Sequence, residues 1–371
     1  MKKKRVCFVT GTRAEFGLMR TVLAAIEKHP ALKLQIVATG MHLDRSRGST
    51  VKSIGRIDGV VGWPDKMPRE IATGRAMAGL ARIFSKLKTD VVLVVGDRVE
   101  AFAAAAAAAI GGRVVAHVHG GDRALGQVDD SLRHAISKLA HVHFPATAES
   151  AARLIRMGEE RWRIHRVGSP GIDGIIQTAA GWREVAREFP GITRRRYALV
   201  VLHPVDDDAR IEATRMTALL AGLLRAGVDG IVAIDPNNDP GAAGIVRATS
   251  KFPCLRAANV PRDIFLGLLR DAAFLAGNSS SGIIEAASFR TPVIDVGPRQ
   301  MGRERARDVV HVPYGREAVR RAAALIWNDG RPLRAKSQNP YQTNGRAGHA
   351  IADILGRLAI GAPLLKKLIS Y

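Results

Sequence analysis

Seven polar, glycine-rich clusters follow apolar runs of this sequence, and their residue types suit proton transfer and phosphate binding. They are residues 10–13, 96–98, 119–122, 203–204, 235–238, 277–282 and 297–300. Carboxylates and histidines can exchange protons with a bound molecule, and arginines and backbone N–H groups can bind its phosphates. Because the carboxyl ends of parallel strands line the ligand crevice of an open sheet, the clusters together predict a ligand site.

The segment 277–282, Gly-Asn-Ser-Ser-Ser-Gly, is the candidate phosphate cradle. It runs directly into two isoleucines, so we expect a turn that opens a helix. Backbone N–H groups and the helix dipole at such a turn bind phosphate, and the hydroxyls of Ser280 and Ser281 add donors. Glu285 would accept hydrogen bonds from ribose hydroxyls. The alternative for the whole segment is an ordinary serine N-cap.

Charged residues mark three further positions. Arg13 follows the first apolar run and is a candidate clamp for the same diphosphate, with a solvated loop arginine as the alternative. Asp97 ends the apolar run 91–95 and would lie at the crevice in a partly dry environment, with a helix cap as the alternative. His117 and His119 share one face of a strand, but no third ligand stands at a useful spacing, so we expect no metal.

The elements that position these clusters alternate between apolar runs and helical patterns, which is typical of repeated βα units with parallel sheets. We expect strands at 5–9, 33–38, 90–95, 113–118, 143–145 and 163–167, and then at 197–202, 230–234, 255–257, 273–276 and 292–296. Helices fit between them, for example at 16–28 and 214–226. The alanine run 103–109 predicts a helix packed closely on a sheet. The fold class is therefore α/β.

Two domains are the natural expectation for 371 residues. We place an N-terminal domain at 1–170 and a C-terminal, nucleotide-binding domain at 190–350, because a polar, arginine-rich stretch separates them. The ligand site would then lie in the cleft between the two domains. The last segment, 351–371, is expected to pack back on the first domain.

The net charge of +22 suits an anionic substrate or a nucleic acid. Aromatic residues make up only 5%, and no nucleic-acid recognition signature occurs, so we expect no specific nucleic-acid partner. No long uncharged apolar run occurs, and the basic start precedes too short an apolar run for a signal peptide, which predicts a cytoplasmic protein without membrane insertion. Cys7 and Cys254 are expected to be structural thiols. The motifs of P-loop and dinucleotide-binding proteins do not occur.

In their order along the chain, the clusters resemble the hydrolysing UDP-N-acetylglucosamine 2-epimerases, from about residue 5 to about residue 350. The matching motifs are Gly11-Thr12-Arg13-Ala14-Glu15, Gly96-Asp97-Arg98, His119-Gly120-Gly121, Asp129-Asp130-x-x-Arg133-His134-Ala135-Ile136-x-Lys138, His203-Pro204, Pro236-Asn237, Gly277–Glu285 and Arg299-Gln300-x-Gly302-Arg303. The resemblance implies two Rossmann-like domains in a glycosyltransferase-B-like fold. It also implies elimination of UDP to a 2-acetamidoglucal and addition of water to give the C2-inverted sugar, without metal or other cofactor. A homodimer is the default assembly.

The resemblance implies roles for individual residues as well. Those that would bind the nucleotide are Arg13, His203, Asn237, Ser279, Ser280, Ser281, Gly282 and Glu285. Those that would transfer protons are Asp97, His119, Asp122, Asp129, Asp130 and His203. Those that would contact the rest of the substrate are Arg98, Arg133, His134, Arg299 and Gln300. From the residues alone, His203 can equally be a structural histidine, and Asp129 with Asp130 can equally cap a helix.

One position departs from the family pattern. Many members carry a glutamate in an H-x-E-G-G motif, where this chain has His119. Either His119 takes over a proton-transfer role, or Asp122 supplies the carboxylate from a shifted position. The sequence leaves both readings open, along with the nucleotide base (UDP- or GDP-linked substrate) and the substituents at sugar C4 and C6.

A glycosyltransferase of the same architecture is the alternative function, because fold alone does not separate it from an epimerase. It would bind the same nucleotide sugar but pass the sugar to an acceptor. The carboxylates Asp97, Asp129 and Asp130 favour the epimerase, since proton transfer at C2 needs such groups and simple transfer does not.

Overall fold

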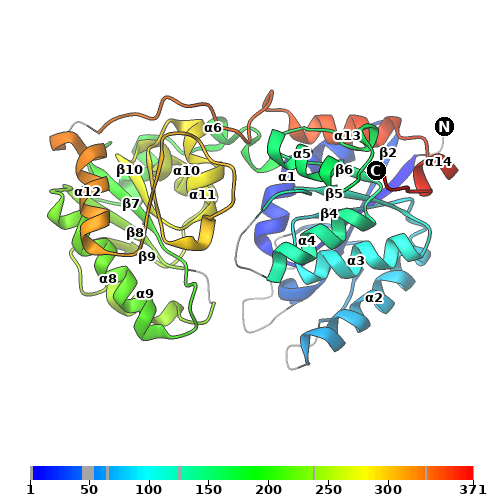
Figure 1. Ribbon diagram of the computed structural model, residues 1–371, viewed down its shortest axis with the longest axis horizontal. Coiled ribbons are helices and arrows are strands. Elements are labelled where there is room, and N and C mark those ends of the chain that lie inside the picture. Colours follow the sequence, from blue (N-terminus) through cyan, green and yellow to red (C-terminus); the bar gives the residue numbers. More distant parts are fainter. Residues whose placement is uncertain are drawn as a thin grey trace. The chain divides into compact units, whose positions relative to one another are not determined.

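The computed structural model describes residues 3–43, 54–63, 67–123, 128–236, 239–330 and 332–370. The chain divides into two compact units (Figure 1). Unit 1 comprises Met1–Asp173 and Tyr341–Tyr371, and unit 2 comprises Gly174–Pro340. Each unit is built on one six-stranded parallel sheet. In the described part of the chain, no helix is both long and apolar enough to cross a membrane.

The sheet of unit 1 has the strand order β3-β2-β1-β4-β5-β6. Its strands are β1 (Lys4–Thr10), β2 (Leu32–Ala38), β3 (Gly59–Val60), β4 (Val91–Val95), β5 (Val114–Val118) and β6 (Val142–Phe144). Its helices are α1 (Arg13–Lys28), α2 (Arg69–Lys86), α3 (Val99–Ile110), α4 (Val128–Leu139), α5 (Ala148–Arg156), α13 (Ala347–Arg357) and α14 (Ala362–Leu365).

The sheet of unit 2 has the strand order β12-β11-β10-β7-β8-β9. Its strands are β7 (Tyr197–Val201), β8 (Gly230–Ile234), β9 (Leu255–Ala257), β10 (Phe274–Gly277), β11 (Val293–Val296) and β12 (Val309–Val312). Its helices are α6 (Ile175–Thr178), α7 (Trp182–Glu188), α8 (Ala209–Arg225), α9 (Ala242–Thr249), α10 (Arg262–Asp271), α11 (Ser280–Ile284) and α12 (Arg316–Trp327).

Unit 1 has a hydrophobic core on each face of its sheet. Val6 and Phe8 of β1 pack in a cluster with residues of α1 and α13, whereas Cys7 and Val9 pack with residues of α2 and α3. Successive side chains of a strand point to opposite faces, so a parallel strand covered on both sides is apolar throughout. The expected alanine helix is α3, and its residues Ala103–Ala108 are all buried.

Three expectations about the elements need correction. Residues 163–167 form no strand, because Arg161–Arg163 is a 3-10 turn and only Ile164 bridges to β6. The strands β3 and β12 were not expected, since β3 has two residues and β12 is a half-exposed edge strand.

The division of the chain also differs from the expected boundaries. The chain returns to unit 1 at Tyr341, ahead of residue 350, and unit 2 begins at Gly174 rather than at residue 190. Two hydrogen bonds hold the outgoing and returning segments together within unit 1. The Ser169 N–H donates to the Tyr341 carbonyl (2.8 Å), and the Thr343 hydroxyl donates to the Val167 carbonyl (2.7 Å).

Candidate active site

His119 and Asp122, in the loop after β5, form a hydrogen-bonded pair. Nδ1 of His119 lies 2.7 Å from Oδ2 of Asp122, and the Ser150 hydroxyl donates to Oδ1 of Asp122 (2.8 Å). Burial acts to raise the pKa of Asp122, but the adjacent His119 outweighs it, and the pKa lies well below its usual range. The carboxylate of Asp122 is therefore ionised. It can accept a hydrogen bond from Nδ1 of His119 when that nitrogen carries a proton. Both candidates for the role of the glutamate in H-x-E-G-G therefore belong to one hydrogen-bonded pair.

The other ring nitrogen of His119 also has a polar partner. Nε2 lies 3.0 Å from the hydroxyl of Ser169, and the imidazole is buried. The backbone of His119 adopts φ 62°, in the left-handed region that is uncommon for residues other than glycine. When Nδ1 alone carries a proton, Nε2 accepts the hydrogen bond of the Ser169 hydroxyl and has the lone pair that a base requires.

Arg133 of α4 joins Asp97 to this pair. Its buried guanidinium forms an ion pair with the carboxylate of Asp97 at the end of β4, and Nη1 donates to the His119 carbonyl at 3.4 Å. The next residue, His134, lies 3.6 Å from Oδ2 of Asp130 one turn earlier in the helix, and burial lowers its pKa. The structure therefore brings Asp97, His119 and Arg133 together at the carboxyl ends of β4 and β5.

A buried carboxyl group near the end of β1 was not among the expected site residues. Glu15 accepts hydrogen bonds from the N–H groups of Gly11 (2.8 Å) and Thr12 (2.9 Å), in the capping box that begins α1. Burial raises the pKa of Glu15 to about 7, and the nearby guanidinium of Arg98 only partly offsets this effect. Arg98 itself is paired with the buried Glu100 at 3.0 Å.

In unit 2 the buried residue Asn278 joins three of the expected clusters through its side chain and its backbone carbonyl. Its Oδ1 accepts from the His203 N–H (2.7 Å), and its Nδ2 donates to the His203 carbonyl (2.8 Å). The Asn278 carbonyl accepts from Gln300 (2.8 Å) and from Arg299 (3.2 Å). Only glycine fits at Gly277 before it, because φ is 140° and a Cβ atom would lie 2.1 Å from the Val201 carbonyl. Asn278 thus connects the loops after β7, β10 and β11 by hydrogen bonds.

The helix that follows the serine-rich turn is short, and serine side chains of the turn form hydrogen bonds within the turn itself. The helix α11 has five residues, and the Ser279 side chain caps it by accepting from the Ser281 N–H. The Ser279 hydroxyl lies 2.8 Å from the Ser281 hydroxyl. The alternative reading of a serine N-cap therefore holds for Ser279. Gly282 is required for packing, since a Cβ atom there would lie 3.0 Å from a methyl group of Val293.

Uncompensated polar groups surround this turn. Within the described residues, Oε2 of Glu285 and Oε1 of Gln300 are buried and have no hydrogen-bond partner. The other oxygen of Glu285 is bound by Arg262 at 2.5 Å. Burial, together with the charge of Arg303, lowers the pKa of Arg299. Because buried polar groups are normally satisfied, these atoms are suited to contact a ligand.

Some expected residues are described only in part. Asn237 lies outside the described residues. Of Arg13 and Asp129 only the backbone is described: Arg13 is the first residue of α1, and Asp129 lies in the first turn of α4. Among the residues that the structure describes, no three His, Cys, Asp or Glu side chains gather as a metal site requires.

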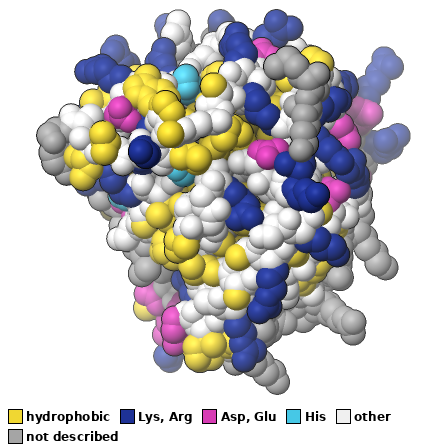
Figure 2. All heavy atoms as spheres, turned by 90° about the vertical axis from the view of Figure 1, so that its right-hand side faces the viewer, with side chains coloured by type: hydrophobic (Ala, Val, Ile, Leu, Met, Phe, Trp, Pro, Cys, Tyr) yellow, Lys and Arg dark blue, Asp and Glu magenta, His cyan; other side chains and the backbone are white. Residues whose placement is uncertain are grey.

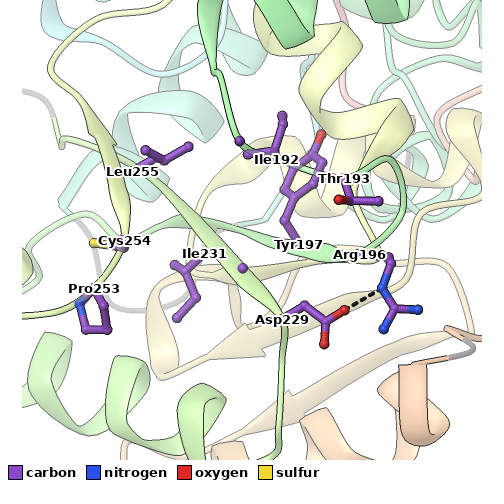
Figure 3. A pocket seen from close by; sticks show the side chains of 11 residues that line it. Ile192, Thr193, Arg196, Tyr197, Asp229, Ile231, Pro253, Cys254 and Leu255 are labelled. Carbon is purple, nitrogen blue, oxygen red and sulfur yellow. Dashed lines mark hydrogen bonds and ion pairs between the residues drawn. The ribbon is translucent and has the colours of Figure 1, made fainter.

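The pocket drawn in Figure 3 lies away from these residues. Its volume is about 290 Å³, and its lining residues are Gly191, Ile192, Thr193, Arg196, Tyr197, Asp229, Gly230, Ile231, Pro253, Cys254 and Leu255. They stand at the amino ends of β7, β8 and β9, whereas the expected site residues follow the carboxyl ends. An ion pair between Arg196 and Asp229 crosses its rim (Figure 3).

The surface charge is dispersed on the face drawn in Figure 2. There, Lys and Arg side chains alternate with hydrophobic and acidic ones and do not gather into one groove. A nucleic-acid site normally concentrates basic side chains along one face.

Two residues of the site escaped sequence reasoning for the same reason. Ser169 stands in Gly-Ser-Pro-Gly, which is typical of a linker, and Asn278 stands at the start of a serine run. Their partners, His119 and His203, are 50 and 75 residues away in sequence. Asn278 lies inside the expected segment 277–282 but had no role assigned to it, and Ser169 lies outside the seven clusters.

Comparison with known proteins identifies the family of this chain. Residues 24–356 match the family model described as UDP-N-acetylglucosamine 2-epimerase. The chain is 35% identical over 334 residues to a UDP-N-acetylglucosamine 2-epimerase of Neisseria meningitidis serogroup B, covering 87% of this chain and 88% of the relative. It is also 35% identical over 381 residues to the UDP-N,N'-diacetylbacillosamine 2-epimerase (hydrolyzing) of Legionella pneumophila, covering 99% and 100%.

A solved structure shares the fold. The UDP-GlcNAc 2-epimerase from Neisseria meningitidis bound to UDP-GlcNAc superposes with a TM-score of 0.82 at 19% identity, covering 95% of this chain and 99% of that one. The expected glycosyltransferase-B-like fold, with two Rossmann-like units and parallel sheets, is confirmed.

Proposed function

We propose that this chain, which belongs to the UDP-N-acetylglucosamine 2-epimerase family, is a hydrolysing enzyme that releases both the nucleotide and a C2-inverted sugar. Its substrate would be UDP-N-acetylglucosamine or a 2,4-diacetamido-trideoxy analogue. The Legionella pneumophila relative, which aligns over its full length, is named as hydrolyzing. The observation that carries the proposal is the His119–Asp122 pair beside the Asp97–Arg133 ion pair.

The two units have different parts in this reaction. In unit 2, the turn 279–282 with Arg299 and His203 would bind the diphosphate, and Glu285 would bind the ribose. In unit 1, Asp97 and the His119–Asp122 pair would act on the sugar. A carboxylate and an imidazole that can each exchange a proton are what removal and return of hydrogen at C2 require.

The chemistry proceeds in two steps. A base takes the C2 proton, the C1–O bond breaks with its electron pair leaving on the diphosphate, and a C1=C2 double bond forms. Arginine and backbone N–H groups stabilise the charge that develops on the leaving group. Water then adds its hydroxyl to C1, and a proton returns to C2 on the opposite face, which inverts C2.

One reaction in D₂O without any acceptor tests this proposal. The expected products, all visible by proton NMR, are free nucleoside diphosphate and a free sugar with inverted C2 and one deuterium at C2. An inverted sugar still attached to its nucleotide would contradict hydrolysis and indicate reversible epimerisation. A free sugar with retained C2 and no deuterium would leave a simple hydrolase. A requirement for an acceptor would favour the glycosyltransferase.

The proposal includes a cytoplasmic homodimer. Both cysteines are free thiols, as is usual in a reducing compartment, and two-fold dimers are the commonest assembly of soluble enzymes. Light scattering on the purified protein should give twice the chain mass of 39.9 kDa. A mass equal to a single chain would contradict the dimer.

A further inference from the structure

The C-terminal segment Gly361–Ser370 is fastened to the rest of unit 1 by two cations, one fully buried and one partly buried. The first is Arg163, whose side chain is fully buried. Its guanidinium donates to the carbonyls of Leu364 (2.8 Å), Pro363 (3.1 Å) and Lys366 (3.2 Å). One side chain therefore satisfies three carbonyls of a segment that contains only the short helix α14.

The second cation is Lys367, which belongs to the segment itself. Its ammonium lies 2.5 Å from Oε2 of Glu159, whose side chain is fully buried. The same carboxylate is bound by Lys138 (2.8 Å) and by His143 (2.9 Å). A buried carboxylate that loses one of several cationic partners is left partly uncompensated, so removal of Lys367 has a cost that a surface ion pair would not have.

Lys367 also reaches the last turn of α4. Its ammonium donates to the carbonyls of Lys138 (2.8 Å) and Ser137 (3.0 Å). The last carbonyls of a helix have no partner within the helix, and a cation placed there is favoured by the helix dipole. The Ser137 hydroxyl in turn donates to the Arg133 carbonyl (3.0 Å), one turn earlier. Lys367 therefore binds α4 at Ser137, one helical turn after Arg133, which in turn binds Asp97.

We infer that Lys367 is a positioning residue, which holds α4 from its carboxyl end so that Arg133 keeps Asp97 and His119 in place. The inference rests on the proposed function insofar as its kinetic test uses turnover. Lys367 lies on the C-terminal segment, far along the chain from the expected motifs. Its effect on the reaction would pass entirely through α4.

The charge of Lys367 depends on pH within a practical range. Burial lowers the pKa of Lys367 to about 8, although Glu159 opposes this effect. The titratable and charged groups that face it are Glu159, Lys138, Arg163, His141 and His143. Above pH 8 the amine becomes neutral and no longer balances Glu159. Wild-type kcat should therefore fall as the pH rises through about 8.

The test compares two adjacent lysines. Lys367→Met removes the partly buried ammonium, and Lys366→Met removes the same charge from an exposed side chain. We expect Lys367→Met to lower kcat by at least about 10-fold, because misplacement of a catalytic group by ~1 Å can cost about 100-fold. Affinity for UDP, measured by calorimetry, should not change. Hydrogen exchange of the amides of α4 should become faster in Lys367→Met only.

Lys367→Arg keeps the charge at every accessible pH and is the conservative variant. It should retain turnover at pH 7 and should lose the alkaline fall in kcat. If Lys367→Met fails to fold, this comparison of pH profiles remains. The inference is wrong if Lys367→Met has wild-type kcat and wild-type exchange in α4, or if Lys367→Arg falls at the same pH as wild type. If the wild type itself turns over no nucleotide sugar, the proposed function fails, while hydrogen exchange still tests Lys367.

Discussion

The two sheets end in loops of opposite chemical character. After the strands of unit 1, charged side chains are bound to one another: Arg133 to Asp97, and His119 to Asp122. After the strands of unit 2, the central group is the neutral Asn278, whose side chain binds the His203 backbone and whose carbonyl accepts from Gln300 and Arg299. Paired titratable groups are suited to moving protons, whereas fixed neutral donors are suited to holding an anion.

Under the proposed function, this difference would divide the reaction between the two units. Both sheets are parallel and six-stranded, so their frameworks present strand ends in the same way. Only the residue types at those ends differ. Variants of unit 1 should therefore change kcat, and variants of unit 2 should change nucleotide affinity.

The largest effect is expected for Asp97→Asn. Turnover should fall at least about 100-fold, the low end for loss of a general acid or base, while UDP affinity stays the same. Steady-state kinetics and calorimetry measure the two quantities. Asp229→Asn, which removes a carboxylate from an ion pair at the rim of the pocket in Figure 3, is the matched control and should stay within a few-fold of wild type. Turnover of Asp97→Asn within a few-fold of wild type would make Asp97 a structural residue.

Next in size is the effect of separating His119 from Asp122. His119→Ala should lower kcat about 100-fold and Asp122→Asn somewhat less, because the carboxylate acts through the imidazole that it orients. The double variant should be no slower than His119→Ala, since residues that act as a unit are not additive. If the fold-losses in kcat of the two single variants multiply in the double variant, His119 and Asp122 act independently of each other.

The counterpart in unit 2 is the pair of hydroxyls in the serine-rich turn. Ser280→Ala combined with Ser281→Ala should weaken UDP binding by about 1–3 kcal/mol, the scale of hydrogen bonds to a charged group. At saturating substrate, kcat should change little. Calorimetry with UDP and with GDP measures the loss. Unchanged affinity for the nucleotide that binds the wild type would remove this turn from the site.

Much of the framework could be predicted because buried parallel strands are continuous apolar runs. The run 91–95 and the strand β7 are such cases, and both are fully buried. The segment 163–167, Arg-Ile-His-Arg-Val, alternates polar and apolar residues but is not a strand, because Arg161–Arg163 is a 3-10 turn and only Ile164 bridges to β6. The buried Arg163 side chain binds the Leu364 carbonyl, 201 residues away in sequence, and so distant a contact leaves no local signal.

The candidate site was predictable in residue type but not in pairing. Spacing placed His119 and Asp122 in one loop, yet whether they were alternatives or partners depended on a 2.7 Å contact. The role of Lys367 depends on contacts with Glu159 and α4, which lie more than 200 residues away in sequence. Long-range polar contacts of this kind have no periodicity, so no local pattern indicates them.

The smallest effect concerns stability, and it tests whether unit 1 holds a carboxyl group neutral near physiological pH. The pKa of Glu15 is raised by burial from 4.5 to about 7. A group whose pKa is raised on folding stabilises the fold fully below its unfolded pKa, and this contribution is lost as the pH rises through the folded pKa. Wild-type unfolding free energy should therefore fall between pH 5 and pH 7.5 by up to about 2 kcal/mol relative to Glu15→Gln.

Urea denaturation of both proteins across this pH range measures the difference. The glutamine oxygen can still accept from the Gly11 and Thr12 N–H groups, so the capping contact itself is kept. Glu184→Gln changes the equivalent capping residue at the exposed start of α7 in unit 2, and its pH dependence should parallel wild type. A constant offset between wild type and Glu15→Gln at all pH values would mean that Glu15 is already ionised.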